Sequence, residues 1–285
     1  SFTLRNGVGA STIYYRAATA VHLLHSNGCN VSGNVIVNSG IGVWIYDASG
    51  NSVTGNGISQ CNYGIIVESS DTNTVTANSV TNNIGGIRLI SSSNNKLRYN
   101  VMTDNSRGFS VSGDTLSMFV NDVDNSNTVN NKPICYLIGA SDETVPTDAA
   151  CVVLVNCTDM TVRNFNLAKA YDAILLAGTH NSTVTNNVIG DSETGIRLFA
   201  SSRNLITGNS LNCSTGIVSD GNGTQLIDNF VKTSNVGITV SGYNQTVAEN
   251  TVEAGTFGGS CNILSCTGAY HNITKNVFRG QTYVG

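Results

Sequence analysis

Short bursts of alternating apolar and polar residues recur along the whole chain, separated by corners of Gly, Asn, Ser and Asp. In one unit the apolar side chains fall at Ile65 and Val67, then at Val75 and then at Val80. A spacing of two within each burst is typical of strands, and bursts of three to five residues broken by turn residues are too short for helices. The pattern therefore predicts two or three short strands in each unit.

These units repeat every 21 or 22 residues. A small residue opens the longest burst, first at Gly42, Gly64, Gly86 and Gly108 and later at Ala173, Gly195, Gly216, Gly237 and Gly259. An asparagine series keeps the same period at Asn34, Asn56, Asn78 and Asn100. One such coil cannot bury its apolar side chains, whereas stacked coils about 4.8 Å apart can. The sequence predicts an all-β fold, a single-stranded parallel β-helix (solenoid) of about twelve coils.

We expect a single β-helix domain over residues 1–285, with one irregular insertion. Regular coils are predicted over 1–112 and 151–285, and an irregular middle segment over 113–150, which holds both prolines. One further coil, with its first position near Asn130, fits between Gly108 and Cys151.

Composition narrows the function classes. Charged residues make up only 11% of the chain and the net charge is −4, which argues against an electrostatic grip on nucleic acid or an anionic membrane. No apolar run approaches the roughly 18 residues of a membrane span. Since the chain begins at Ser1 in the middle of the pattern, we expect that an upstream segment, a secretory signal, has been removed.

The recurring unit x-N-x-V-x-x-N-x-I/V…G-I-x-L resembles the right-handed β-helix repeats of NosD-type and related archaeal and bacterial cell-surface proteins. The middle segments from Asn125 to Ile138 and from Val145 to Cys157 resemble a linker that recurs in those proteins. The resemblance covers nearly the whole chain. It implies a right-handed helix and an extracellular, cell-surface or cell-envelope location, and it implies little about activity.

The NosD-type resemblance also implies copper as a candidate ligand. A copper site would need imidazole or sulfur ligands. The chain offers His22, His25, His180, His271, Met102, Met118 and Met160. His22 and His25 are the one close pair, and three residues along a strand place them on opposite faces. The repeat also aligns His22 with Trp44 of the next coil, so ring stacking is the alternative. We expect neither a metal site nor a cofactor.

Many β-helix proteins are carbohydrate-active enzymes, such as pectin lyases, polygalacturonases, epimerases and phage depolymerases. Glycoside hydrolysis needs two carboxylates roughly 5–9.5 Å apart, which requires acids stacked one or two coils apart. Asp191, Glu193 and Asp220 do not stack in this register, and other acids gather only in the irregular segment. We expect no catalytic residues and no enzymatic activity. Aromatic residues that could stack on sugars are Trp44, Tyr46 and Tyr63.

The eight cysteines suit an oxidising compartment. The repeat favours Cys135–Cys157 as an intrachain bridge and Cys135–Cys151 as the second choice, while Cys261 and Cys266 could close a small loop within one coil. No partner in an adjacent coil matches Cys29, Cys61 and Cys213. These three either fill the core as buried thiols or form intermolecular disulfides.

Asparagine is the acceptor in seven Asn-x-Ser/Thr sequons, about as many as chance gives with 38 Asn and 61 Ser and Thr in the chain. The possible N-glycosylation sites at predicted corners are Asn181, Asn222 and Asn244.

The continuous repeat favours a structural function. We expect an extracellular, self-assembling subunit of a cell-envelope layer, sheath or filament, whose partners are copies of itself packed end to end or laterally. The alternative is a β-helix protein that binds or cleaves a surface polysaccharide along one exposed sheet. Cell-surface glycans are then the partner, and nucleic acid and a membrane span are excluded in both cases.

Overall fold

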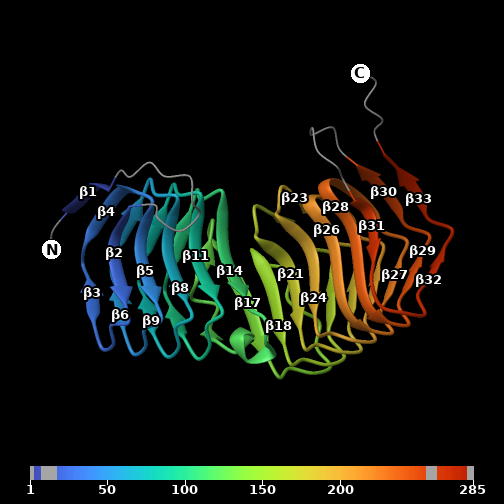
Figure 1. Cartoon of the computed structure of the whole chain (residues 1–285), viewed down its shortest axis with the longest axis horizontal. Coiled ribbons are helices and arrows are strands. Elements are labelled where there is room, and N and C mark those ends of the chain that lie inside the picture. The colour runs from blue at the N-terminus through green and yellow to red at the C-terminus, as the bar shows by residue number, and fades with distance from the viewer. Residues whose placement is uncertain (1–2, 8–17, 255–261, 281–285) are drawn as a thin grey trace, which may run out of the picture. The chain divides into compact units, whose positions relative to one another are not determined.

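The computed structural model describes residues 3–7, 18–254 and 262–280 of the chain. It divides into two compact units, Ser1–Ile134 and Cys135–Gly285. Each unit is a stack of coils, and most coils add one short strand to each of three runs of parallel strands (Figure 1).

The first unit contains three parallel sheets. One has the strand order β14-β11-β8-β5-β2, and its strands are β2 (Thr19–Leu24), β5 (Ile41–Tyr46), β8 (Tyr63–Glu68), β11 (Gly85–Ile90) and β14 (Arg107–Ser112). The second consists of β3 (Asn30–Ser32), β6 (Ser52–Thr54), β9 (Thr74–Thr76), β12 (Lys96–Arg98) and β15 (Asp122–Val123). The third pairs in sequence β1 (Thr3–Gly7), β4 (Val35–Ser39), β7 (Gly57–Ser59), β10 (Ser79–Thr81), β13 (Val101–Thr103) and β16 (Thr128–Val129).

The second unit repeats this arrangement. Its six-stranded sheet consists of β19 (Thr161–Arg163), β22 (Thr183–Thr185), β25 (Leu205–Thr207), β27 (Gln225–Ile227), β29 (Thr246–Ala248) and β32 (Asn272–Thr274). A second run of parallel strands consists of β18 (Cys151–Val155), β21 (Asp172–Ala177), β24 (Thr194–Phe199), β26 (Ser210–Asn222), β28 (Phe230–Tyr243) and β31 (Asn262–Cys266). A third run joins β20 (Asn166–Ala168) and β23 (Val188–Gly190) to the first halves of β26 and β28, followed by β30 (Thr251–Ala254) and β33 (Val277–Arg279).

Inward side chains stack in register from coil to coil. Val43, Ile65 and Ile87 are paired in successive strands and none of them is exposed to solvent. The residue before each of them is a glycine, because the coils approach too closely there for a side chain. A Cβ on Gly86 would lie 2.2 Å from the carbonyl oxygen of Gly108.

Buried asparagines form hydrogen-bonded ladders at the corners. In the predicted series, both the backbone N–H and the side-chain Nδ2 of Asn56 donate to Oδ1 of Asn78, each at 3.0 Å. Asn78 donates in the same way to Asn100. Further ladders, which the sequence pattern did not single out, connect Asn51, Asn73, Asn95 and Asn121 and, in the second unit, Asn187, Asn209, Asn229 and Asn250.

The coil expected near Asn130 is present, but it begins irregularly. Ser141 and Thr144 pair in parallel with Thr158 and Thr161 of the next coil. A short 3₁₀ helix, η1 (Leu116–Phe119), interrupts the repeat, and β17 (Lys132–Ile138) pairs antiparallel with β16, Thr128 opposite Pro133. The insertion lengthens the ladder step from 22 residues to 26 between Asn95 and Asn121. The middle segment is therefore irregular, as predicted.

The predicted fold class is confirmed. Among the described residues, the first unit has five-stranded sheets and the second a six-stranded one, close to the expected number of coils. No helix in the described part of the chain has the length and apolarity needed to cross a membrane.

Candidate functional site

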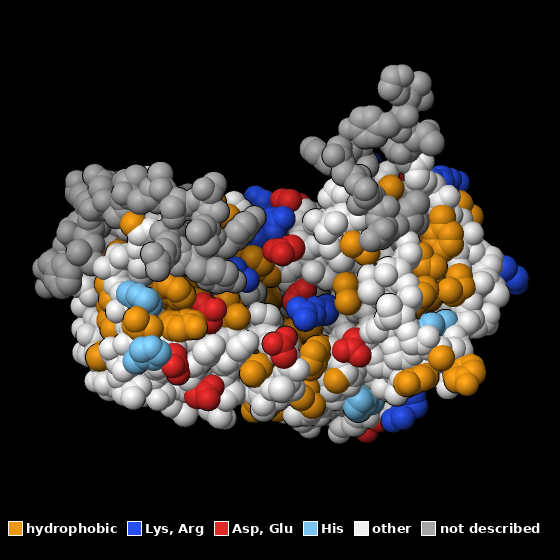
Figure 2. Space-filling view, viewed as in Figure 1, with side chains coloured by type: hydrophobic (Ala, Val, Ile, Leu, Met, Phe, Trp, Pro, Cys, Tyr) orange, Lys and Arg blue, Asp and Glu red, His pale blue; other side chains and the backbone are white. Residues whose placement is uncertain are grey.

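A strip of aromatic side chains lies on the outer face of the first unit. In β5, the side chains of Val43 and Ile45 point into the core of the unit. Trp44 and Tyr46 alternate with them and therefore point outward. Strand pairing places Trp44 opposite His22 of β2, and Tyr46 opposite Glu68 of β8. In Figure 2, hydrophobic and histidine side chains gather on the face over β2, β5 and β8. We call His22, Trp44, Tyr46 and Tyr63 the aromatic strip.

The rings at the centre of the strip contact one another. His22 stacks on Trp44 with ring centroids 4.5 Å apart and planes 6° apart, which confirms the stacking predicted from the register. Tyr46 is tilted by 58° against Trp44 at 5.4 Å. Contact with neighbouring rings restricts the rotamers of all three side chains, so a ligand meets a largely preformed surface.

Charged groups border these rings. The indole N–H of Trp44 donates to Oε2 of Glu68 at 3.1 Å. His25 Nδ1 lies 2.9 Å from Oδ2 of Asp47, and its ring packs at a tilt against Tyr46. Burial, and secondly the nearby His25, lower the pKa of His22, which favours its neutral form. The strip therefore combines apolar ring surface with carboxylate oxygens that accept hydrogen bonds.

Tyr63 lies one coil further along and contacts a cation. The guanidinium carbon of Arg88 lies 5.3 Å from the centroid of the Tyr63 ring, a cation–π arrangement. Sequence reasoning named the three aromatic residues but not Glu68 or Arg88. The 22-residue period contained the signal for Glu68, since it aligns that residue with Tyr46.

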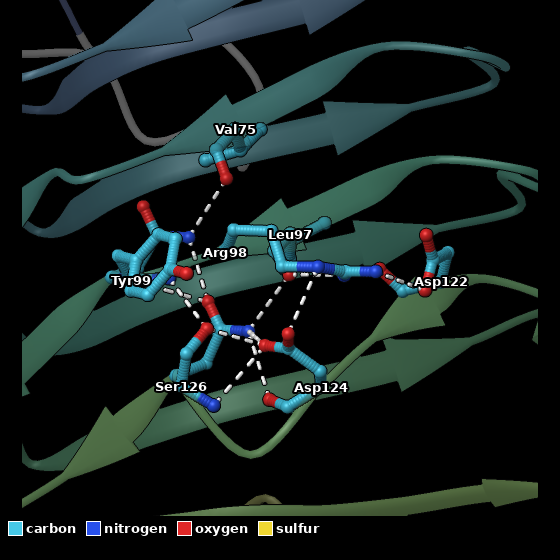
Figure 3. A network of polar contacts seen from close by, with 9 residues as sticks. Val75, Leu97, Arg98, Tyr99, Asp122, Asp124 and Ser126 are labelled. Atoms are coloured by element: carbon cyan, nitrogen blue, oxygen red, sulfur yellow. Dashed lines mark hydrogen bonds and ion pairs between the residues drawn. The ribbon is translucent and has the colours of Figure 1, made fainter.

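A charged network in the first unit is centred on Arg98 and is structural. Arg98 binds Asp122 Oδ1 at 2.5 Å through Nη2 and Asp124 Oδ2 at 2.9 Å through Nε (Figure 3). Asp124 also accepts hydrogen bonds from Ser126, and Ser126 Oγ accepts one from the backbone of Tyr99. The network fixes the corner that follows the insertion, and it leaves both carboxylates bound to Arg98.

One acid of the second unit, Asp172, is largely buried beside an arginine. Asp172, at the start of β21, lies opposite Thr194, and its Oδ2 is 3.7 Å from Nη1 of Arg197. Burial raises the pKa of Asp172, although Arg197 and a hydrogen bond from Thr194 oppose that change. The search for stacked acids in the sequence missed it because its neighbour in the next coil is a threonine.

The described residues contain no group of three or more His, Cys, Asp or Glu side chains that could hold a metal ion. His180 Nδ1 accepts a hydrogen bond from the backbone of Ser202, and His271 Nδ1 one from Gln245. Met102 and Met160 are buried in the core.

The cysteines named from the sequence lie mainly in the interior. Cys135, Cys151 and Cys157 are thiols in the structure, and Cys157 Sγ lies 3.6 Å from the carbonyl oxygen of Leu137. Burial is the main cause that raises the pKa of Cys135 to about 11 and that of Cys151 to about 12. The bridge between Cys135 and either partner stays a prediction.

The remaining cysteines differ in accessibility. Cys61 and Cys213 are buried, Cys29 is half-buried and Cys266 is exposed. Cys261 lies outside the described residues. The three possible acceptors Asn181, Asn222 and Asn244 are exposed at corners or strand ends of the second unit.

The chain is similar to several solved β-helix structures. A mutant DFA-IIIase from Arthrobacter chlorophenolicus A6 matches at 13% identity and a TM-score of 0.39, over 89% of this chain and 74% of that one. The Dettilon tailspike protein matches at 14% identity and a TM-score of 0.39, over 90% of this chain and 55% of that one. At these identities the likeness concerns the fold alone. None of the curated proteins matches the chain.

Two family models match the sequence. The model described as "Right handed beta helix region" covers residues 5–146. The model described as "Periplasmic copper-binding protein (NosD)" covers residues 117–285, more than half of the chain. The chain therefore belongs to the NosD family of right-handed parallel β-helix proteins.

Proposed function

We propose that this protein binds carbohydrate on the aromatic strip of its first unit. The observation that carries the proposal is the packed set of outward rings, with His22 flat on Trp44 and Tyr46 beside it. Rings held in this way offer apolar area at low conformational cost, which suits contact with the C–H groups of sugars. The carboxylate of Glu68, held by the Trp44 indole, supplies an acceptor for sugar hydroxyls.

The geometry of the coils supports a linear glycan that lies along the stacking direction. His22 and Trp44 occupy the same position in adjacent coils, and coils repeat about every 4.8 Å. A step of that size is comparable with the length of one sugar in an extended chain. Successive sugars can then contact successive coils, from His22 past Trp44 towards Tyr63 and Arg88.

The proposal is one of binding without turnover. Two carboxylates with separate roles are needed for glycoside hydrolysis. Beside the strip, Glu68 accepts the Trp44 N–H and Asp47 is paired with His25. Both acids thus hold the rings in place, and Glu68 keeps lone pairs that can accept from a sugar hydroxyl. Asp172 belongs to the other unit and lies beside Arg197.

Copper, which the family's description implies, does not fit the described residues. His22 stacks on Trp44, His25 is paired with Asp47, and His180 accepts a backbone hydrogen bond. The buried thiols around Cys135 form no three-ligand group with the acids and histidines described. We assign no role to copper in the function of this chain. The family's periplasmic description supports an extracellular or cell-envelope location.

Self-assembly is the second candidate function, and one observation favours it. Ile273 of β32 and Phe278 of β33 continue the inward ladders of Val247 and Val252, which are fully buried. In the last described coil these two side chains are 42% and 40% exposed. Such a surface suits packing against another copy of the chain, end to end or laterally, in a layer, sheath or filament.

A glycan panel tests the first candidate. Immobilised neutral and acidic polysaccharides are screened with the wild-type chain, Trp44→Ala, and Tyr243→Ala as the matched exposed aromatic of the other unit. We expect wild type and Tyr243→Ala to bind alike, and Trp44→Ala to lose at least tenfold in affinity. Absence of binding across the panel, or equal binding by all three proteins, contradicts carbohydrate recognition by the strip.

Electron microscopy of the native material, with and without reductant, tests the second candidate. Assembly predicts ordered filaments or layers that Ile273→Asp and Phe278→Asp disperse. Separate particles under both conditions contradict it, and loosening by reductant indicates that intermolecular disulfides contribute.

A further inference from the structure

We propose that Asn181 and Asn244 of the second unit are acceptors for N-linked glycans, and that Asn222 is not. The inference is independent of the aromatic strip, which lies in the first unit. It starts from the contrast between two kinds of asparagine in this fold, those in buried ladders and those at exposed corners.

Every sequon asparagine is exposed. The seven acceptors are Asn30, Asn156, Asn181, Asn212, Asn222, Asn244 and Asn272. By contrast, 16 asparagines in the described chain are buried, and none of those belongs to a sequon. The number of sequons is what chance gives, but their placement leaves every acceptor within reach of an enzyme.

Asn181 and Asn244 occupy the same corner position in different coils. One column of corner residues runs through successive coils and consists of Asn181, Arg203, Gly223 and Asn244. The backbone N–H of each donates to a carbonyl of the next coil, namely that of Ser202, Asn222, Tyr243 and Ala269. Asn181 and Asn244 both have a left-handed backbone, with φ of 53° and 54°. Three coil steps separate them, roughly 14 Å, which leaves room for a glycan on each.

The reactive amide nitrogen is available at both positions. In the buried ladders Nδ2 is occupied, as in Asn209, which donates to Val184 and to Asn229. Asn181 uses only its Oδ1, which accepts from Arg203 Nε at 2.9 Å. Among the described residues, no hydrogen bond engages Nδ2 of Asn181 or of Asn244.

The three sequons differ in how exposed the threonine hydroxyl is that lies two residues after the asparagine. Thr183 and Thr246 begin β22 and β29 with partly exposed side chains on the outer face. Thr224 of the Asn222 sequon is fully buried, and its Oγ1 accepts from the backbone of Asn204 at 3.4 Å. A transferase that must contact both the amide and this hydroxyl can reach them at Asn181 and Asn244, but not at Asn222.

The reaction needs a glycosyl donor, which we take to be an oligosaccharide linked through phosphate to a lipid. Nδ2 attacks the anomeric carbon, forming the N–C bond while the bond from that carbon to the phosphate oxygen breaks. The lipid phosphate leaves with the electron pair, and the amide nitrogen loses one proton to a base of the transferase. No group is oxidised or reduced.

Glycopeptide mass spectrometry of the chain purified from the organism that makes it tests the proposal. We expect glycan on the peptides of Asn181 and Asn244 and an unmodified Asn222. In the same host, Asn181→Gln and Thr183→Ala should each remove one glycan, whereas Thr183→Ser keeps the hydroxyl and should keep the glycan.

Unmodified peptides at Asn181 and Asn244 overturn the proposal, and so does a glycan on Asn222 at the same occupancy as the other two. Because Thr183→Ser tests the hydroxyl without changing the acceptor, a folding defect in Asn181→Gln cannot hide the result. Circular dichroism of each variant confirms that the β structure is retained.

Discussion

The buried asparagines each satisfy several backbone groups at once. Asn78 donates through Nδ2 to the carbonyl of Val53 at 2.8 Å and to Oδ1 of Asn100 at 3.0 Å. Its own Oδ1 accepts from the backbone and the side chain of Asn56. A side chain with both a donor and an acceptor is needed at such a corner, because a buried polar group without a partner is costly.

Replacing a ladder asparagine should therefore destabilise the fold. Asn78→Ala removes the acceptor of the Asn56 N–H and one of the donors to the Val53 carbonyl, and we expect a loss of about 2–4 kcal/mol in the free energy of unfolding. Asn62→Ala, at an exposed position, is the control and should change stability by less than about 0.5 kcal/mol. Denaturant titration measures both, and similar midpoints for the two variants would show that the ladder contributes little.

His22 makes stability depend on pH. Burial and the nearby His25 lower its pKa in the folded state below the usual 6.5, so the unfolded chain binds the proton more readily. The free energy of unfolding should fall as the pH drops below about 6.5, until the folded state is protonated as well. His22→Phe keeps a ring on Trp44 without the titration, so its melting temperature should fall less between pH 7.5 and 5. Identical pH profiles for the two proteins would contradict this role of His22.

At the scale of the strand, close approach of the backbones decides which residue is allowed. Gly64, Gly86 and Gly108 open the longest strand of successive coils. At each of them, atoms of the neighbouring coil occupy the space that a Cβ would need. Gly57 of β7 is different, because a Cβ there would have no atom within 4 Å.

Gly86→Ala and Gly57→Ala form a matched pair. A Cβ on Gly86 would overlap the carbonyl of Gly108, so we expect a loss of about 1–3 kcal/mol or more in stability. Gly57→Ala should be neutral or stabilising by about 0.4–1 kcal/mol, since it restricts only the unfolded chain. Thermal unfolding compares them, and a Gly86→Ala variant as stable as Gly57→Ala would refute the close packing of the coils.

The elements were predictable where the period is strict. The spacing of 22 residues places Gly42, Gly64 and Gly86 in one register, and the strand pairs Val43–Ile65 and Ile65–Ile87 follow from it. The irregular start of the coil near Asn130 was not predicted, because η1 inserts residues into one coil and β17 turns back against β16. A period contains no information about the path of the chain across an insertion.

At the scale of the whole molecule, the family could be inferred from the repeat, while the surroundings of the strip could not. Trp44 and Tyr46 were recognised as aromatic residues with a possible role in sugar stacking. Their contacts depend on rotamers, such as the indole N–H pointing to Glu68 and His25 turning to Asp47. Alternation along a strand gives the face on which a side chain lies, but not the direction of its polar atoms.

The division into two units is also a property of the folded chain. The same repeat runs through both, yet the aromatic strip belongs to the first unit and the corner asparagines Asn181 and Asn244 to the second. Glycan recognition and glycan attachment, as we propose them, thus belong to different parts of one molecule. Disruption of one site should leave the other unchanged.

Intrinsic fluorescence offers the most direct test of the central claim, because Trp44 is the one tryptophan in the chain. Titration with soluble oligosaccharides from any glycan that binds in the panel should shift and saturate the Trp44 emission, and Tyr46→Ala should weaken the apparent affinity severalfold. A saturable shift that Tyr243→Ala leaves unchanged is the result we predict. Glycan binding with no change in Trp44 emission would place the ligand elsewhere and contradict the aromatic strip as the binding site.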